Sequence, residues 1–304
     1  MSTTSRSQGR FGLSGSVTRV WGEQQERIIT GLPSIAGPNG SNAVGPQDIS
    51  MVGQGNAVVL VGLGADPAKR AGLGSAGAVM GHLIQVQPSG QWKSRVDVSA
   101  YEAQANPDRG EVDSNPYGVF SLPGTDLVVD AGANALLSVA ANGTVSTVAV
   151  FPDRMVDALP FLNLPPGTKI PMQSVPVSVA VGPDGAYYVG ELTGFPFQHG
   201  AANVYRVVPG QAPTVYASGF TNIIDVAFAP DGSLYVLEIA TNSLLSGNPA
   251  GALKRVPPGG GQSSVVASVG LINPTALALG PDGSIYVSNN GLSPDAGEVI
   301  RVHP

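Results

Sequence analysis

The chain has 304 residues, a formal net charge of −6 and only 12% charged residues. With no basic patch to neutralise a phosphate backbone, nucleic acid is excluded as a partner. The absence of cysteine excludes disulfides, thiolate metal sites and cysteine nucleophiles. The 41 glycines and 26 prolines stand singly between β-branched runs, a pattern that disfavours long helices and predicts a β protein with many turns.

The N-terminal stretch MSTTSRSQGRFGLSG lacks the apolar core of a secretory signal peptide. No run in the chain approaches the roughly 18 apolar residues that a membrane span requires. We therefore expect an irregular segment over residues 1–15, a single β domain over residues 16–304, and no membrane span.

The first predicted strands are SVTRVW at 16–21 and ERIITG at 26–31. Paired hairpins follow, each made of two β-branched or alternating runs around a glycine-containing turn. In the first two units they lie at 46–61 and 83–98, and at 116–129 and 136–150. In the next two units they lie at 176–189 and 204–217, and at 222–236 and 253–267. The last unit has one hairpin at 274–287 and a single strand at 298–302.

Three of these hairpins are near-copies: PVSVAVGPDGAYYV, NIIDVAFAPDGSLYV and PTALALGPDGSIYV. Their Pro-Asp-Gly turns recur at intervals of about 50 residues, which fits a four-stranded propeller blade better than a helical repeat. The sequence thus predicts an all-β propeller.

The strand count at the two ends bears on the number of blades. Six segments match the third strand of a blade, because 16–21 and 298–302 both fit. The first lacks a preceding hairpin and the last lacks a following strand. We predict a six-bladed propeller with an incomplete first or last blade, which an additional N-terminal hairpin and strand would complete. A five-bladed ring is the alternative. The unclosed edge would favour pairing with a second copy, giving a homo-oligomer.

One long insertion, FPDRMVDALPFLNLPPGTKIPMQ at 151–173, is rich in apolar residues and proline. Such a segment is too apolar to stand alone in water, so we expect it to fold back over the ring as structural cover or as a lid.

Polar residues recur beside the first strands and at the ends of the second strands of the repeats. In a propeller both positions face the mouth of the central channel. Carboxylates and amides there suit calcium or another divalent cation, or one of the acids could act as a general base. The alternative is that they only satisfy loop N–H groups. The candidate ligand-binding residues are Asn115, Asp130, Glu191, Asn222, Glu238, Asn273 and Asn290.

Other chemistries find no support in the sequence. The three histidines have no second histidine at ligand spacing, so no transition-metal site is predicted. There is no Gly-x-Ser-x-Gly elbow, and Gly53-Gln54-Gly55 is a hairpin turn without the context of a dinucleotide loop. No catalytic residue and no cofactor is assigned, apart from the divalent cation considered above.

Four segments resemble the ScyD/ScyE family: DSNPYGVF from 113, VPVSVAVGPDGAYYVGELTGFPF from 175, YASGFTNIIDVAFAPDGSLYVLEIA from 216 and PTALALGPDGSIYVSNNG from 274. These are bacterial propeller-type proteins named after members encoded beside the genes for scytonemin, an indole-phenol pigment. Family members usually carry a signal peptide and an additional hairpin at the N-terminus, where this chain has none. The resemblance implies an exported protein linked to secondary metabolism, and it implies no reaction.

Two functions therefore remain open. The first is a binding or scaffold propeller for a small molecule or another protein, located outside the cytoplasm. The alternative is an enzyme of the lactonase or strictosidine-synthase-like kind that uses carboxylates at the channel mouth.

Overall fold

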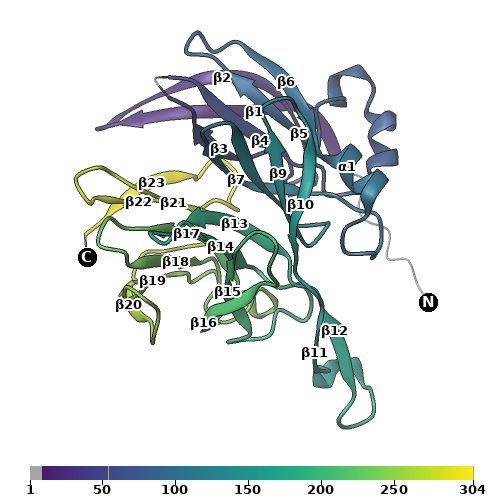
Figure 1. Ribbon diagram of the computed structural model, residues 1–304, viewed down its shortest axis with the longest axis vertical. Coiled ribbons are helices and arrows are strands. Elements are labelled where there is room, and N and C mark those ends of the chain that lie inside the picture. The colour runs from purple at the N-terminus through teal and green to yellow at the C-terminus, as the bar shows by residue number, and fades with distance from the viewer. Residues whose placement is uncertain (1–8, 54, 304) are drawn as a thin grey trace.

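A computed structural model describes residues 9–53 and 55–303. The described residues form five blades in a ring, so the chain is a β-propeller (Figure 1). The prediction of an all-β propeller is confirmed, and the structure supports the five-bladed alternative.

Four blades are complete antiparallel sheets whose strands follow chain order. Blade 1 comprises β3 (Pro46–Met51), β4 (Ala57–Val61), β5 (His82–Val86) and β6 (Trp92–Asp97). Blade 2 comprises β7 (Pro116–Leu122), β8 (Thr125–Asp130), β9 (Ala135–Ala140) and β10 (Val145–Val150). Blade 3 comprises β13 (Pro176–Val181), β14 (Tyr187–Glu191), β15 (Ala202–Val207) and β16 (Thr214–Phe220). Blade 4 comprises β17 (Ile223–Phe228), β18 (Leu234–Glu238), β19 (Ala252–Val256) and β20 (Ser264–Ala267).

Blade 5 has three strands, β21 (Ala276–Leu279), β22 (Ile285–Asn289) and β23 (Glu298–Val302). The first predicted strand pair forms a separate two-stranded sheet of β1 (Arg10–Trp21) and β2 (Gln24–Ala36), which packs against blade 1. Among the described residues this hairpin joins no other sheet, so the predicted sixth blade is represented by two strands only. Because β1 begins at Arg10, residues 10–15 are strand where we expected an irregular segment; residues 1–8 lie outside the described residues.

The first strands of successive blades lie side by side, β3 against β7, β7 against β13, β13 against β17, and β17 against β21. They therefore line the propeller axis. Blades 1 to 4 have a register shift near the start of the first strand, between its first residue and its third. Such a bulge redirects the side chain that follows it.

The Pro-Asp-Gly turns have a second role beyond reversing the chain. Asp184 accepts a hydrogen bond from Ala186 N at 3.2 Å and pairs with Arg206 of the third strand at 2.7 Å. Asp231 bonds Ser233 N and pairs with Arg255 at 2.8 Å in the same way. The repeated aspartate thus fastens the first turn of a blade to its third strand.

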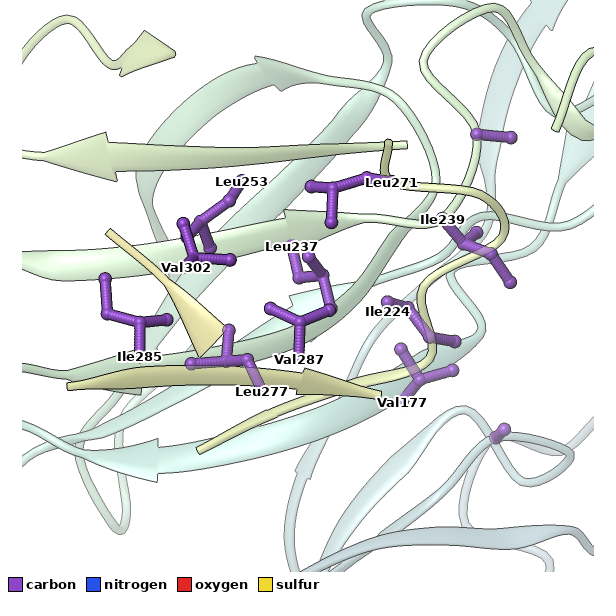
Figure 2. Packing of buried hydrophobic residues seen from close by; sticks show 12 residues of the cluster. Val177, Ile224, Leu237, Ile239, Leu253, Leu271, Leu277, Ile285, Val287 and Val302 are labelled. Carbon is purple, nitrogen blue, oxygen red and sulfur yellow. The ribbon is translucent and has the colours of Figure 1, made fainter. Parts of the chain in front are cut away.

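One large buried cluster joins blades 3, 4 and 5 (Figure 2). Val177 of β13 and Ile224 of β17 lie beside Leu237 of β18. From blade 5, Val287 packs against the same side chains. Burial of such apolar surface is the main contribution to the stability of the ring.

The apolar insertion does not cover the ring. Phe151 is buried, but β11 (Arg154–Asp157) and β12 (Lys169–Met172) form a hairpin that projects from the propeller (Figure 1). Its side chains Met155 and Phe161 are each 61% exposed. The expectation of structural cover is wrong, because the hairpin satisfies its own backbone by pairing β11 with β12.

The helical elements are short. They are the α-helix α1 (Val98–Ala105) and the 3₁₀ helices η1 (Pro67–Leu73), η2 (Ser75–Gly77), η3 (Pro160–Leu162) and η4 (Leu244–Ser246). No helix within the described part of the chain is both long and apolar enough to cross a membrane.

Candidate functional site

The acids predicted at the channel mouth occupy equivalent places in successive blades. Asp130, Glu191 and Glu238 are the last residues of the second strands β8, β14 and β18, and Asn289 has this place in β22. All four are buried, with exposed fractions of 0 to 1%. No contact among the described residues joins two of them, so the structure places them at one end of the ring without bringing them together.

Each acid is engaged by its own blade. Asp130 accepts hydrogen bonds from Ser114 Oγ at 2.6 Å and Asn115 N at 2.7 Å, and burial raises the pKa of its carboxyl. Glu238 accepts from Thr221 N at 2.7 Å and from Lys254 Nζ at 2.8 Å. In both blades the carboxylate holds the chain that leads into the first strand.

Glu191 is also held by hydrogen bonds, and its cationic partner is Arg154. Its carboxylate accepts from Arg154 Nη2 at 2.5 Å and from Asn203 N at 2.9 Å. Burial raises the pKa of Glu191, while the charge of Arg154 opposes that change. Arg154 is the first residue of β11, so this ion pair anchors the projecting hairpin to blade 3.

The predicted asparagines also have structural roles. Asn222 donates to Leu192 O at 2.8 Å and accepts from Leu244 N at 2.9 Å, which ties the loops of blades 3 and 4. Asn222, Asn273 and Asn290 have positive φ values of 49°, 39° and 57°, a backbone region that asparagine tolerates. Asn115 has a buried Oδ1 without a hydrogen-bond partner among the described residues. Ligand binding by these residues stays a prediction.

Sequence reasoning missed three residues on the first strands themselves: Asp48 of β3, Tyr117 of β7 and Asp225 of β17. Each side chain is partly exposed, although the strands around it are apolar. The sequence did carry a signal for the two aspartates, which is a carboxylate inside an apolar first strand. The segments PQDISM and NIIDVAF have aspartate at the position where PYGVFSL has glycine and PVSVAV has serine.

The two aspartates bridge adjacent blades. Asp48 accepts from Val119 N of β7 at 2.7 Å and from Ile49 N at 2.7 Å. Asp225 accepts from Leu277 N of β21 at 2.7 Å and from Val226 N at 2.8 Å. In both places a carboxylate oxygen therefore links the first strands of two adjacent blades.

Blades 2 and 3 are joined differently, through a small residue on the first strand of blade 2. A side chain on Gly118 would lie 2.5 Å from Val177 O and 3.0 Å from the Cα of Ser178. The backbones of β7 and β13 are thus in direct contact, with no side chain between them.

The two carboxyls at the axis have different pKa values. Burial raises the pKa of Asp48 to about 6, against the hydrogen bonds from Val119 and Ile49. Burial, followed by the charge of Asp48, raises the pKa of Asp225 to about 8. Burial also raises the pKa of Tyr117, with further contributions from the charges of Asp225 and Asp48. Of the two carboxyls, Asp225 is therefore the one that more readily keeps a proton near neutral pH.

This arrangement offers both a donor and an acceptor to a bound molecule. When Asp225 is protonated, its O–H is free to donate, because its two hydrogen bonds are accepted from backbone N–H groups. Ionised Asp48 can accept. Tyr117, on which the charges of both aspartates act, adds a phenolic hydroxyl. We take these three side chains as the candidate site. Among the described residues, no three histidine or acidic side chains converge closely enough to hold a metal ion as they stand.

Comparisons with known proteins bear on the fold of this chain. No family model matches the chain, and no curated protein matches it. Among solved structures, a catalytically inactive virginiamycin B lyase from Staphylococcus aureus with quinupristin is 13% identical, with a TM-score of 0.52 over 99% of this chain and 86% of that one. A gluconolactonase from Xanthomonas campestris is 14% identical, with a TM-score of 0.54 over 99% and 89%.

A chain of the nidogen–laminin complex has 12% identity and a TM-score of 0.56 over 97% of this chain and 92% of that one. These likenesses show a propeller fold. At such low identity they carry no activity, ligand or partner over to this chain.

Proposed function

We propose that this protein is a binding propeller whose axial channel holds a small, hydroxyl-bearing molecule. The observation that supports this most directly is the placement of Asp48, Tyr117 and Asp225 on three first strands, where burial raises the pKa of both carboxyls and that of Asp225 more. A ligand hydroxyl both donates and accepts, so it matches this pair better than a charged group would. A rigid ring pre-organises the site.

The resemblance to the ScyD/ScyE family narrows the ligand. It supports a phenolic or indolic metabolite of a secondary pathway, and a location outside the cytoplasm. Both remain proposals that rest on the four resembling segments.

Binding of a phenolic panel, measured by calorimetry, tests the proposal. Wild-type protein is expected to bind at least one phenol, and Tyr117→Phe is expected to weaken binding by about tenfold, the value of one hydrogen bond of about 1.4 kcal/mol. Tyr286→Phe, on the middle strand of blade 5 and 37% exposed, is the matched control. Equal affinity in the two variants, or no binding by wild type, contradicts the proposal.

A second candidate is a lactonase or strictosidine-synthase-like enzyme. One observation favours it: two coupled carboxyls with separated pKa values are the arrangement of a general acid and a general base. Its carboxylates would be Asp48 and Asp225, because Glu191 and Glu238 are occupied by Arg154 and Lys254. The test is turnover of a panel of lactones. Turnover that Asp225→Asn abolishes and Glu23→Gln retains would establish this function, whereas no turnover by the wild-type protein would favour the binding protein.

We also propose self-association at the open edge of blade 5. Within the described residues β23 pairs only with β22, whereas the other blades have a fourth strand. Val299 on this edge is 48% exposed. An unpaired edge is a template for a strand of a second copy. Light scattering is expected to show a dimer that Val299→Lys weakens; a monomer at all concentrations contradicts this.

A further inference from the structure

A serine, a histidine and an aspartate of blade 1 form a chain of polar contacts. His82 Nδ1 lies 2.7 Å from Ser94 Oγ. The other ring nitrogen, Nε2, is buried, lies 3.2 Å from Asp97 Oδ2 and has no other partner among the described residues. A hydroxyl within reach of a base, with the base oriented by a third group, is the arrangement that nucleophilic catalysis requires.

The arrangement depends on a β-bulge in the fourth strand. Ser94 and Asp97 lie three residues apart on β6, so in a regular strand their side chains would point to opposite faces. The register with β5 shifts at Arg95, which is an extra residue on β6. Since His82 is the cross-strand partner of Asp97, the bulge brings Ser94 to the face of the sheet that holds both of them.

The blade architecture does not require these three residues. The ladder between β9 and β10 of blade 2 has the same bulge at the same place as the ladder between β5 and β6. The places of His82, Ser94 and Asp97 are taken there by Ala135, Thr147 and Val150. A complete blade therefore folds without the three polar groups, and packing alone does not explain them.

Asp97 is held firmly in place. Arg70 Nη1 donates to its Oδ1 at 2.8 Å, Arg70 Nη2 pairs with its Oδ2, and Ser99 Oγ donates to its Oδ1 at 2.8 Å. Burial raises the pKa of Asp97, but the hydrogen bonds from His82 and Arg70 outweigh burial and hold that pKa well below its usual range. Because Arg70 balances much of its charge, the carboxylate serves mainly to orient the ring of His82.

The ionised carboxylate sets the tautomer of His82. A carboxylate only accepts hydrogen bonds, so the neutral ring facing Asp97 has its proton on Nε2. Nδ1 is then an acceptor, and Ser94 Oγ donates to it. The side chain of His82 is only 13% exposed, whereas Ser94 is exposed. The base is thus shielded from water while the hydroxyl is open to a substrate.

The surroundings of Ser94 supply a donor and an apolar surface. β6 is the last strand of blade 1 and, within the described chain, pairs only with β5 (Figure 1). Gln87 N donates to Gln91 O, and bonded pairs alternate along an antiparallel ladder, so the N–H of Ser94 points away from β5. This N–H can stabilise an oxyanion that forms at Ser94. Half-buried Trp92, two residues earlier on the same face, offers an apolar surface beside it.

We propose that Ser94 and His82 are the nucleophile and the general base of a site that hydrolyses esters of small apolar acids. Ser94 Oγ attacks the carbonyl carbon while its proton moves to His82 Nδ1. The bond to the alcohol oxygen then breaks, and the alcohol leaves with that proton, so an acyl ester remains on Ser94. Water attacks this ester and gives a proton to His82 Nδ1, and the acid leaves as Ser94 Oγ takes the proton back. Asp97 is a positioning residue.

This site is separate from the side chains at the axis. Ser94 is on a fourth strand, whereas Asp48, Tyr117 and Asp225 are on first strands. The reaction also differs from that of the lactonase alternative, which would use carboxylates and form no acyl-serine. Failure of one proposal therefore leaves the other intact.

The test is labelling of the full chain with a fluorophosphonate and with p-nitrophenyl acetate, followed by peptide mass spectrometry. Wild-type protein is expected to gain one adduct per chain, on Ser94, and Ser94→Ala is expected to lose it. His82→Gln is expected to slow labelling about 100-fold or more, which is the usual contribution of a general base. Ser146→Ala, which removes an exposed serine of the fourth strand β10, is the matched control and keeps the wild-type rate.

The role of Asp97 has its own measurement. Nitrogen NMR of His82 is expected to show the proton on Nε2 in wild type, and Asp97→Asn is expected to remove this preference and to slow labelling about tenfold or more, since the amide can also donate. An aspartate that only stabilises the fold would leave the tautomer unchanged. Unfolding midpoints check that each variant is folded, and Ser94→Ala decides the proposal where Asp97→Asn is not. No adduct on wild type, or equal labelling of Ser94→Ala or His82→Gln, overturns the proposal.

Discussion

Replacing Lys254 by methionine tests whether the acids at the strand ends hold the blades together. Glu238 is fully buried, and its Oε1 accepts from Lys254 Nζ at 2.8 Å and from Thr221 N at 2.7 Å. Methionine keeps most of the lysine stem but removes the charge, which leaves Glu238 buried with one backbone donor. Losing one member of a buried pair costs about 3–5 kcal/mol.

The cost translates into a measurable change in melting temperature. With an unfolding entropy of about 2.1 cal/mol/K per residue over 304 residues, the midpoint should fall by about 5–8 °C. The double variant Lys254→Met with Glu238→Gln removes both charges and should recover most of the loss, because glutamine can still accept from Thr221 N.

Urea and thermal unfolding of the single and double variants provide the assay. Lys169→Met is the control, since Lys169 pairs with exposed Asp157 on the projecting hairpin and should cost less than about 1 kcal/mol. A loss below about 1 kcal/mol in Lys254→Met, or a double variant as unstable as the single one, would refute the structural role of Glu238.

Two further predictions concern the axis. Since the folded-state pKa values of Asp48 and Asp225 are raised to about 6 and 8, the folded protein holds protons that the unfolded chain has released, and the contribution of these groups to stability should fall as pH rises from about 4 to 8. Urea midpoints measured across this range check the sign, and Asp225→Asn should flatten the dependence; a rise in this contribution over the same range would contradict it. Gly118→Ala should cost about 1–3 kcal/mol, because its Cβ would lie 2.5 Å from Val177 O, whereas Gly72→Ala has no neighbour within 4 Å and should be nearly neutral. Equal unfolding midpoints of the two alanine variants would show that the seam between β7 and β13 can relax.

The repeats could be predicted from the sequence because successive blades share one local hairpin pattern. A Pro-Asp-Gly turn between β-branched runs predicts a hairpin without knowledge of the ring. The positions at the strand ends were also found, since Asp130, Glu191 and Glu238 recur at one point of the repeat. What the sequence could not supply was the identity of their partners, because Arg154 and Lys254 lie elsewhere in the chain.

The axial residues and the projecting hairpin were missed for different physical reasons. Asp48 and Asp225 occur in only two of five first strands, so a search for recurring residues does not find them. The hairpin of β11 and β12 was expected to seek apolar cover, but local strand pairing satisfied its backbone first. Composition indicates how apolar a segment is, and does not indicate what it contacts.

The unequal seams of the ring have a consequence for how the molecule comes apart. The first strands of blades 2 and 3 meet through direct contact of their backbones, whereas those of blades 4 and 5 meet through short β21 and the carboxylate of Asp225. Blade 5 also packs on blade 4 through the buried apolar cluster, but it has only three strands and an open edge. Local opening is therefore expected to begin at the C-terminal blade. Amide protons of β22 should exchange with deuterium earlier than those of β14, and early unfolding should leave a partly formed arc of the remaining blades.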